Sequence, residues 1–137
     1  MGTERFWRAM WMVAVWHNII GGLGVAFLGD WIYAREGLPA PSPGVNYLRW
    51  WLMILVFGYI YYLVSQDLYN SRNLVLAGIL GKLASATSDL YYLVFVGGVP
   101  RIFWTTVCTD YAFVVLFWMF LGFVKNQKQR LAAAASG

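Results

Sequence analysis

Hydrophobic residues run through most of the chain in four long stretches, which are separated by short segments that carry glycine, proline or charge. Each stretch is long enough to form a helix of about 20 residues, the length that crosses a hydrocarbon core of about 30 Å. The pattern therefore predicts four membrane-spanning helices. Their expected ranges are 6–28, 47–68, 72–98 and 101–124, followed by a basic tail over 125–137.

The third stretch carries charge where a membrane helix is expected to carry none. Lys82, Ser85 and Asp89 recur at helical spacing along one stripe of the segment 72–98. A charged side chain inside the hydrocarbon costs several kcal/mol unless it meets a partner or a water-filled cavity. The other spans are therefore expected to supply groups that face this stripe.

Two other predicted helices place an ionisable side chain at the depth of Lys82. At about 1.5 Å per residue, His17, Lys82 and Asp110 each lie roughly 15 Å from the same boundary, which is near the centre of the core. We expect a buried ion pair between Lys82 and Asp110, with His17 and Asn18 completing its hydrogen bonds. Asp89 has no evident counter-charge, which makes its surroundings the first place to look for a ligand.

These polar residues form one candidate site, for which three roles stay open. A Lys–Asp pair can hold helices in register without binding anything. It can also line a binding or reactive site for a small, partly polar molecule, or belong to a proton or ion path, although one pair and one histidine make a short relay. The candidate ligand-binding residues are His17, Asn18, Lys82, Ser85, Asp89, Thr106 and Asp110, and the candidate catalytic residues are Asp110, Asp89 and Lys82.

Glycine and proline predict where helices pack and where they end. Gly21 and Gly24 lie on the His17 side of the first span, and that face is expected to pack inward. The segment 29–46 contains three closely spaced prolines and predicts the one substantial loop. A stripe of small residues in the third span favours close packing against a neighbour, and it consists of Ala77, Gly81, Ala84 and Ser88.

Composition and charge support a membrane protein. The chain is 61% hydrophobic and only 12% charged over 137 residues, which excludes a soluble domain and predicts a single all-α membrane domain over 1–137, a four-helix bundle. The net charge of +4 comes from Lys and Arg residues scattered at the predicted helix ends. Basic residues in such positions set the orientation of membrane helices and contact lipid headgroups, and they do not indicate nucleic-acid binding. Six basic residues on one face against three on the other predict that both termini lie inside.

Motifs for metals and common cofactors are not found in the sequence. His17 has no His, Cys or carboxylate at i+3 or i+4, so a helical metal site is not predicted. Bis-histidine ligation of haem is disfavoured because the chain has one histidine. The single cysteine, Cys108, excludes an internal disulfide, and we expect it to be a packed, unreactive side chain. No cofactor is therefore predicted. Eight Trp, nine Tyr and nine Phe exceed what two interfacial belts require, and this surplus favours binding of a lipophilic molecule such as a quinone or a lipid.

The sequence resembles the small four-helix bacterial membrane proteins of the DoxX-like type. The resemblance rests on the overall length, the GGLG end of the first span, the proline-containing loop and a third helix of the form RNLVLAGILGKL. It implies a bacterial cytoplasmic membrane protein, in a group of which some members are linked to quinone-coupled sulfur oxidation. No active-site motif matches, so the resemblance assigns no catalytic residue.

The function expected from these features is that of an accessory subunit or a module that binds a lipophilic molecule in the bilayer. Its partners would then be lipid, a larger membrane complex or further copies of the chain. One alternative is a membrane enzyme in which Asp110 or Asp89 acts as acid or base and Lys82 orients an anion. A second alternative is a small oligomeric transporter or channel, because four short spans need a larger assembly to form a pore.

Overall fold

The computed structural model describes residues 2–39 and 44–135, and helices account for most of this part of the chain. Four of them are long and apolar enough to cross a membrane, as the sequence predicts. They are α1 (Gly2–Arg35), α2 (Gly44–Gln66), α3 (Arg72–Tyr91) and α4 (Phe103–Ala135), and a π-helical segment, η1 (Tyr92–Val96), continues α3.

The first connection is shorter than predicted because α1 continues to Arg35 instead of ending at residue 28. No proline interrupts this segment before Pro39, so nothing prevents the helix from running through Gly29. The helix ends in a Schellman motif, in which Gly37 adopts a φ of 68° and Leu38 N donates to Tyr33 O at 3.0 Å. Residues 40–43 of the predicted loop lie outside the described residues.

The other helix ends follow the sequence more closely. Helix α2 ends at Gln66 rather than 68, and η1 ends at Val96 rather than 98. Gly97 and Gly98 then turn the chain with φ values of 77° and 76°, a conformation that side chains disfavour. Helix α4 runs through the basic tail to Ala135, and its alanine-rich end favours this continuation.

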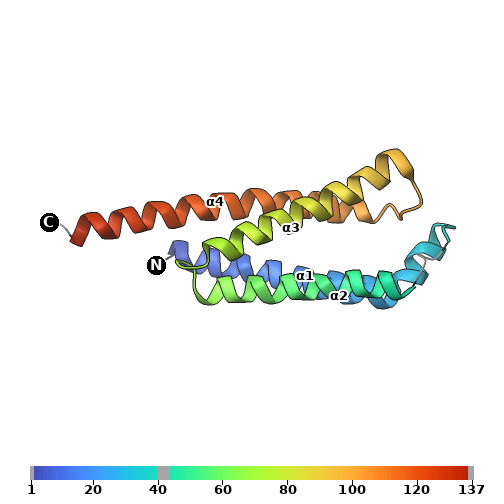
Figure 1. Ribbon diagram of the computed structural model, residues 1–137, viewed down its shortest axis with the longest axis horizontal. Coiled ribbons are helices and arrows are strands. Elements are labelled where there is room, and N and C mark those ends of the chain that lie inside the picture. Colours follow the sequence, from blue (N-terminus) through green and yellow to red (C-terminus); the bar gives the residue numbers. More distant parts are fainter. Residues whose placement is uncertain (1, 40–43, 136–137) are drawn as a thin grey trace.

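The helices form two antiparallel pairs. Figure 1 shows α1 beside α2 and α3 beside α4, and the closest backbone packing occurs within these pairs. The C-terminal part of α4 extends beyond the ends of the other helices (Figure 1). At about 1.5 Å per residue its 33 residues span roughly 50 Å, more than a hydrocarbon core of about 30 Å.

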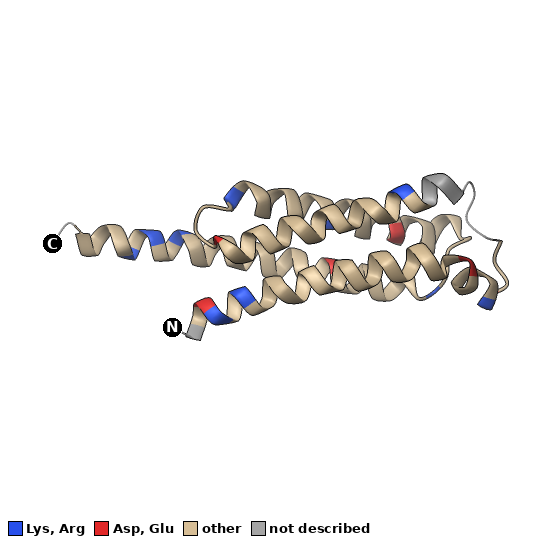
Figure 2. Ribbon diagram, turned by 90° about the horizontal axis from the view of Figure 1, so that it is seen from below, with Lys and Arg blue, Asp and Glu red and all other residues tan. Residues whose placement is uncertain are grey.

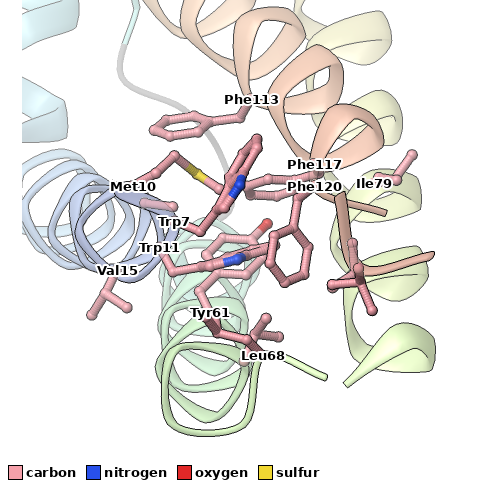
Figure 3. Close-up of a cluster of buried hydrophobic side chains, with 14 residues drawn as sticks. Trp7, Met10, Trp11, Val15, Tyr61, Leu68, Ile79, Phe113, Phe117 and Phe120 are labelled. Carbon is pink, nitrogen blue, oxygen red and sulfur yellow. The ribbon is translucent and has the colours of Figure 1, made fainter. Parts of the chain in front are cut away.

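Aromatic side chains join the two pairs in the half of the bundle that holds the N-terminus. Trp11 of α1 is fully buried and stacks on Phe117 of α4, with ring centroids 4.2 Å apart. Phe120 and Tyr61 pack against the same indole at 5.3 and 5.7 Å (Figure 3). Aromatic pairs in such geometry add about 0.5–1.5 kcal/mol each beyond the area they bury. This cluster therefore closes one half of the interior.

Close approach of α3 to α2 depends on two glycines of α3, of which only Gly81 was expected to pack closely. Gly78 of α3 lies so near the buried Tyr61 ring that a Cβ would come within 2.8 Å of it, and Gly81 faces the Phe57 ring in the same way. Gly81 belongs to the predicted small-residue stripe, but Ala84 of that stripe is exposed. A Cβ placed on Gly21 or Gly24 would meet nothing within 4 Å, so neither glycine makes the close packing contact that was expected of this face.

Cys108 was also expected to be packed, and it is exposed instead. Its neighbour Val107 takes the buried position on α4. Adjacent helical residues point about 100° apart, so one of the two had to face outward.

We predict that Gly78→Ala lowers the free energy of unfolding by about 1–3 kcal/mol more than Gly24→Ala does. Both changes add the same methyl group and gain the same helix propensity, but only the first forces that group against Tyr61. Denaturation of both variants in mild detergent, followed by circular dichroism, gives the difference. Equal stability of the two variants would show that α3 can shift away from α2 at no cost.

Candidate functional site

An ion pair lies in the interior of the bundle, as the sequence predicts. Lys82 Nζ of α3 is 2.5 Å from Asp110 Oδ1 of α4, and the two side chains are 7% and 3% exposed. It is the one salt bridge within 2–39 and 44–135. Inside the bundle each of these charges is stabilised by the other. An unpaired ion in this position would lose its hydration and gain no opposite charge in return.

Asn18 connects this ion pair to the other two helices. Its Oδ1 accepts a hydrogen bond from Lys82 Nζ at 2.9 Å, and its Nδ2 donates to the backbone oxygen of Ile54 in α2 at 3.2 Å. Gly58 of α2 lies beside Asn18, and a Cβ on it would meet Asn18 Cβ at 3.5 Å, an ordinary van der Waals distance. One polar network thus joins all four helices.

His17 takes a place at the edge of this network and makes no direct contact with the ion pair. Its Nε2 lies 3.1 Å from Thr109 Oγ1 of α4, and its Nδ1 lies 3.5 Å from Asn18 Oδ1. The imidazole also packs edge-on against Phe113, with centroids 5.2 Å apart. His17 therefore links α1 to α4 and lies beside the Asn18 oxygen that accepts the hydrogen bond from Lys82.

A cavity of about 300 Å³ lies directly beside the ion pair, and all four helices contribute to it. On the side of the N-terminus it ends at the polar network and the aromatic cluster around Trp11. Toward the opposite end of the bundle, Trp51 stacks on Phe103 at 6.0 Å and Tyr33 packs on the same ring at 6.4 Å. The lining residues are His17, Asn18, Gly21, Gly22, Val25, Trp50, Trp51, Met53, Ile54, Phe57, Tyr61, Gly81, Lys82, Ala84, Ser85, Thr106 and Asp110.

The cavity reaches the surface between α2 and α3. Its most exposed lining side chains are Trp50 and Met53 of α2, at 56% and 55%, and Ala84 of α3 is also exposed. On the opposite side the contact between His17 and Thr109 ties α1 to α4. Trp50, Met53 and Ala84 therefore lie at the mouth of the cavity on the outer surface of the bundle.

The structure gathers six of the seven candidate ligand-binding residues around this cavity: His17, Asn18, Lys82, Ser85, Thr106 and Asp110. Asp89 is half-buried, does not line the cavity, and has no hydrogen bond to any described residue. A role of Asp89 in ligand binding therefore stays a prediction. Sequence reasoning did not assign Gly21 or Trp50 to the site, although both line the apolar part of the cavity. The signal for Gly21 was present in the GGLG segment but was interpreted as packing.

Several polar groups at the cavity keep hydrogen-bonding capacity. An ammonium group has three donors, and Lys82 uses two of them on Asp110 and Asn18. The hydroxyl groups of Ser85 and Thr106 make no hydrogen bond within the described part of the chain, although both residues line the cavity. The site can therefore donate to an acceptor such as a carbonyl oxygen. The same part of the chain contains no group of three or more His, Cys, Asp or Glu side chains that could hold a metal ion.

Comparison with known proteins finds no matching family model, no matching curated protein and no matching solved structure.

We predict that Lys82→Met and Asp110→Asn each lower the free energy of unfolding by about 3–5 kcal/mol, because each leaves a buried charge unpaired. The double variant leaves no charge and should be much more stable than the sum of the two losses implies. Unfolding in mixed micelles by increasing denaturing detergent measures all three. Asp89→Asn provides the matched control, since Asp89 has no contact with Lys82, and its effect should add to that of Lys82→Met. Additive losses for Lys82 and Asp110 would contradict the pairing.

Proposed function

We propose that the chain binds a lipophilic molecule with a compact polar head inside the bilayer, as a binding module or an accessory subunit of a larger membrane complex. The observation that carries this proposal is the position of the Lys82–Asp110 pair at the end of a mostly apolar cavity. A pair that served packing alone would be surrounded by side chains on every side. Here the cavity adjoins it, and donors of Lys82, Ser85 and Thr106 stay available.

The size of the cavity favours a single ring or a short head group. A volume of about 300 Å³ is at the lower end for small-molecule sites. A longer apolar tail then extends between α2 and α3 along Trp50 and Met53, which are exposed there. A quinone has these properties, because its flat ring fits among aromatic side chains and its carbonyl oxygens accept hydrogen bonds. The DoxX-like resemblance of the sequence agrees with this class of ligand.

We also propose that both termini face the cytoplasm of a bacterial cell. The end of the bundle that holds them contains six basic residues and two acidic ones, whereas the other end contains three of each (Figure 2). Cytoplasmic ends of membrane helices carry such an excess of Lys and Arg. The cavity then lies in the outer half of the membrane.

A pair of glycine variants tests the cavity without removing any polar group. We expect Gly21→Leu to fill the cavity and weaken the binding of a short-chain benzoquinone at least about tenfold, a change of about 1.4 kcal/mol. Gly24→Leu should leave binding unchanged, because Gly24 is equally free of neighbours but does not line the cavity. Saturable quenching of tryptophan fluorescence in nanodiscs reports binding, since Trp50 and Trp51 lie at the site.

Thermal unfolding of both glycine variants establishes that each is folded before its binding is compared. Mass spectrometry of molecules that purify with the wild-type chain and are lost from Gly21→Leu would support the proposal and identify the natural ligand class. Quenching that is equal in the two variants, or that never saturates, would contradict binding in the cavity.

The topology has its own test in a Cys108→Ser background. We expect Arg35→Cys to react in intact cells with a maleimide that cannot cross membranes, because Arg35 ends α1 at the end of the bundle opposite the termini, which the proposed topology puts outside. Gln129→Cys should react only after the cells are made permeable. The reverse labelling pattern would place both termini outside.

A further inference from the structure

A second hollow lies at the opposite end of the bundle from the cavity. It is a groove of about 780 Å³ between the start of α3 and the second half of α4. The turn before α3 contributes to its edge. We call it the basal groove, and it is lined by Leu68, Tyr69, Arg72, Leu76, Trp118, Met119, Phe120, Leu121, Gly122, Val124, Lys125, Lys128 and Gln129.

The rim of the basal groove is basic and carries no salt bridge. Arg72, Lys125 and Lys128 are all exposed, and none has an ion-pair partner among the described residues. The two acidic residues of this end are engaged in hydrogen bonds. Glu4 accepts a bond from the Tyr69 hydroxyl, and Asp67 accepts bonds from the Asn70 side chain at 3.0 and 3.2 Å. Asp67 attracts Lys128 without forming an ion pair with it. The rim therefore keeps an excess of positive charge.

The start of α3 adds a further attraction for an anion at this rim. The residue before the helix, Ser71, makes no capping hydrogen bond from its side chain and instead donates its hydroxyl to Asp67 O. The first backbone N–H groups of α3 therefore have no side-chain acceptor. Such groups at a helix N-terminus favour phosphate and carboxylate. They lie beside Arg72, the first residue of the helix.

The wall of the basal groove is apolar and leads toward the membrane interior. Leu68 and Phe120 form its buried floor, while Trp118 and Met119 are 66% and 57% exposed at its side. Gly122 leaves open space, because nothing lies within 4 Å of its Cβ position. Lys125 and Trp118 are separated by about 10 Å along α4. The groove thus has a basic end at the depth of lipid headgroups and an apolar end at the depth of acyl chains.

We propose that the basal groove is a binding site for an anionic phospholipid. The phosphate lies among Arg72, Lys125 and Lys128, and one acyl chain follows α4 past Gly122 to Trp118. The charge of the whole chain supports this occupant, because the net +4 resides entirely at this end of the bundle (Figure 2). Basic pockets between membrane helices on the cytoplasmic side recognise such headgroups.

The first test compares charge variants by native mass spectrometry of the protein released from detergent. The lipids are a phosphatidylglycerol and a phosphatidylcholine with identical acyl chains. Each basic residue near the headgroup contributes a factor of about five in affinity, so Lys125→Gln/Lys128→Gln should weaken phosphatidylglycerol binding roughly 25-fold. The matched control is Arg35→Gln/Arg49→Gln, which removes the same charge at the other end and should leave binding unchanged. Equal losses in the two double variants, or equal binding of both lipids by the wild type, would overturn the proposal.

The second test separates a lipid site from a site for free phosphate. Gly122→Leu places a side chain in the basal groove and keeps every basic residue, so phosphatidylglycerol binding should fall at least about tenfold. Inorganic phosphate and glycerophosphate should not displace the lipid from the wild type. Displacement by inorganic phosphate at millimolar concentration, together with unchanged lipid binding by Gly122→Leu, would show that the groove binds phosphate without an acyl chain and would overturn the proposal.

Discussion

The structure depends on a pair of opposite charges that cannot be separated inside the membrane. Lys82 and Asp110 are on neighbouring helices, and each is stable in the hydrocarbon only while it contacts the other. Asn18 extends this constraint to α1 and α2 through its bonds to Lys82 and Ile54. The rotation and depth of the four helices are therefore coupled through this polar network. Side-chain packing then has to fit that arrangement.

Aromatic packing decides which side of the polar network is filled. In the half that holds the N-terminus, the buried rings of Trp11, Phe117 and Phe120 pack together in the interior. In the other half, glycines 21 and 22 of α1 and Gly81 of α3 line the wall, and an open volume remains next to the ion pair. The chain thus uses its largest residues to hold the helix pairs together at one end. Its smallest residues leave the cavity open at the other.

The cavity and the basal groove are built on different physical principles. The cavity offers a few donors in an apolar space, and it favours a neutral molecule with hydrogen-bond acceptors. The basal groove presents exposed cations near the membrane surface, where long-range attraction to anionic lipid operates. Both use α3 and α4, but they lie at opposite ends of those helices. The cavity and the basal groove share no lining residue, so the two proposed ligands would not compete for the same side chains.

Depth in the membrane could be predicted well from the sequence because a helix has a constant rise per residue. That rise placed Lys82 and Asp110 at one level, and the cost of an unpaired charge in hydrocarbon then required them to meet. The number of membrane-length helices followed from the length of the apolar stretches in the same way. The distances of Asn18 and His17 from the ion pair were not predictable, since a rotation of a few tens of degrees changes which of the two adjacent residues faces inward.

The sequence by itself determined the class of the protein, its four helices and the identity of its buried ion pair, because these follow from hydropathy, helix rise and the cost of charge. The tertiary structure alone decided which glycines are covered and which are open. Gly78 meets Tyr61, whereas Gly21 faces empty space, and nothing in the local sequence distinguishes such positions. The difference arises from the rotation and separation of neighbouring helices, which depend on contacts between residues far apart in the chain. The cavity beside Lys82 is a consequence of that arrangement.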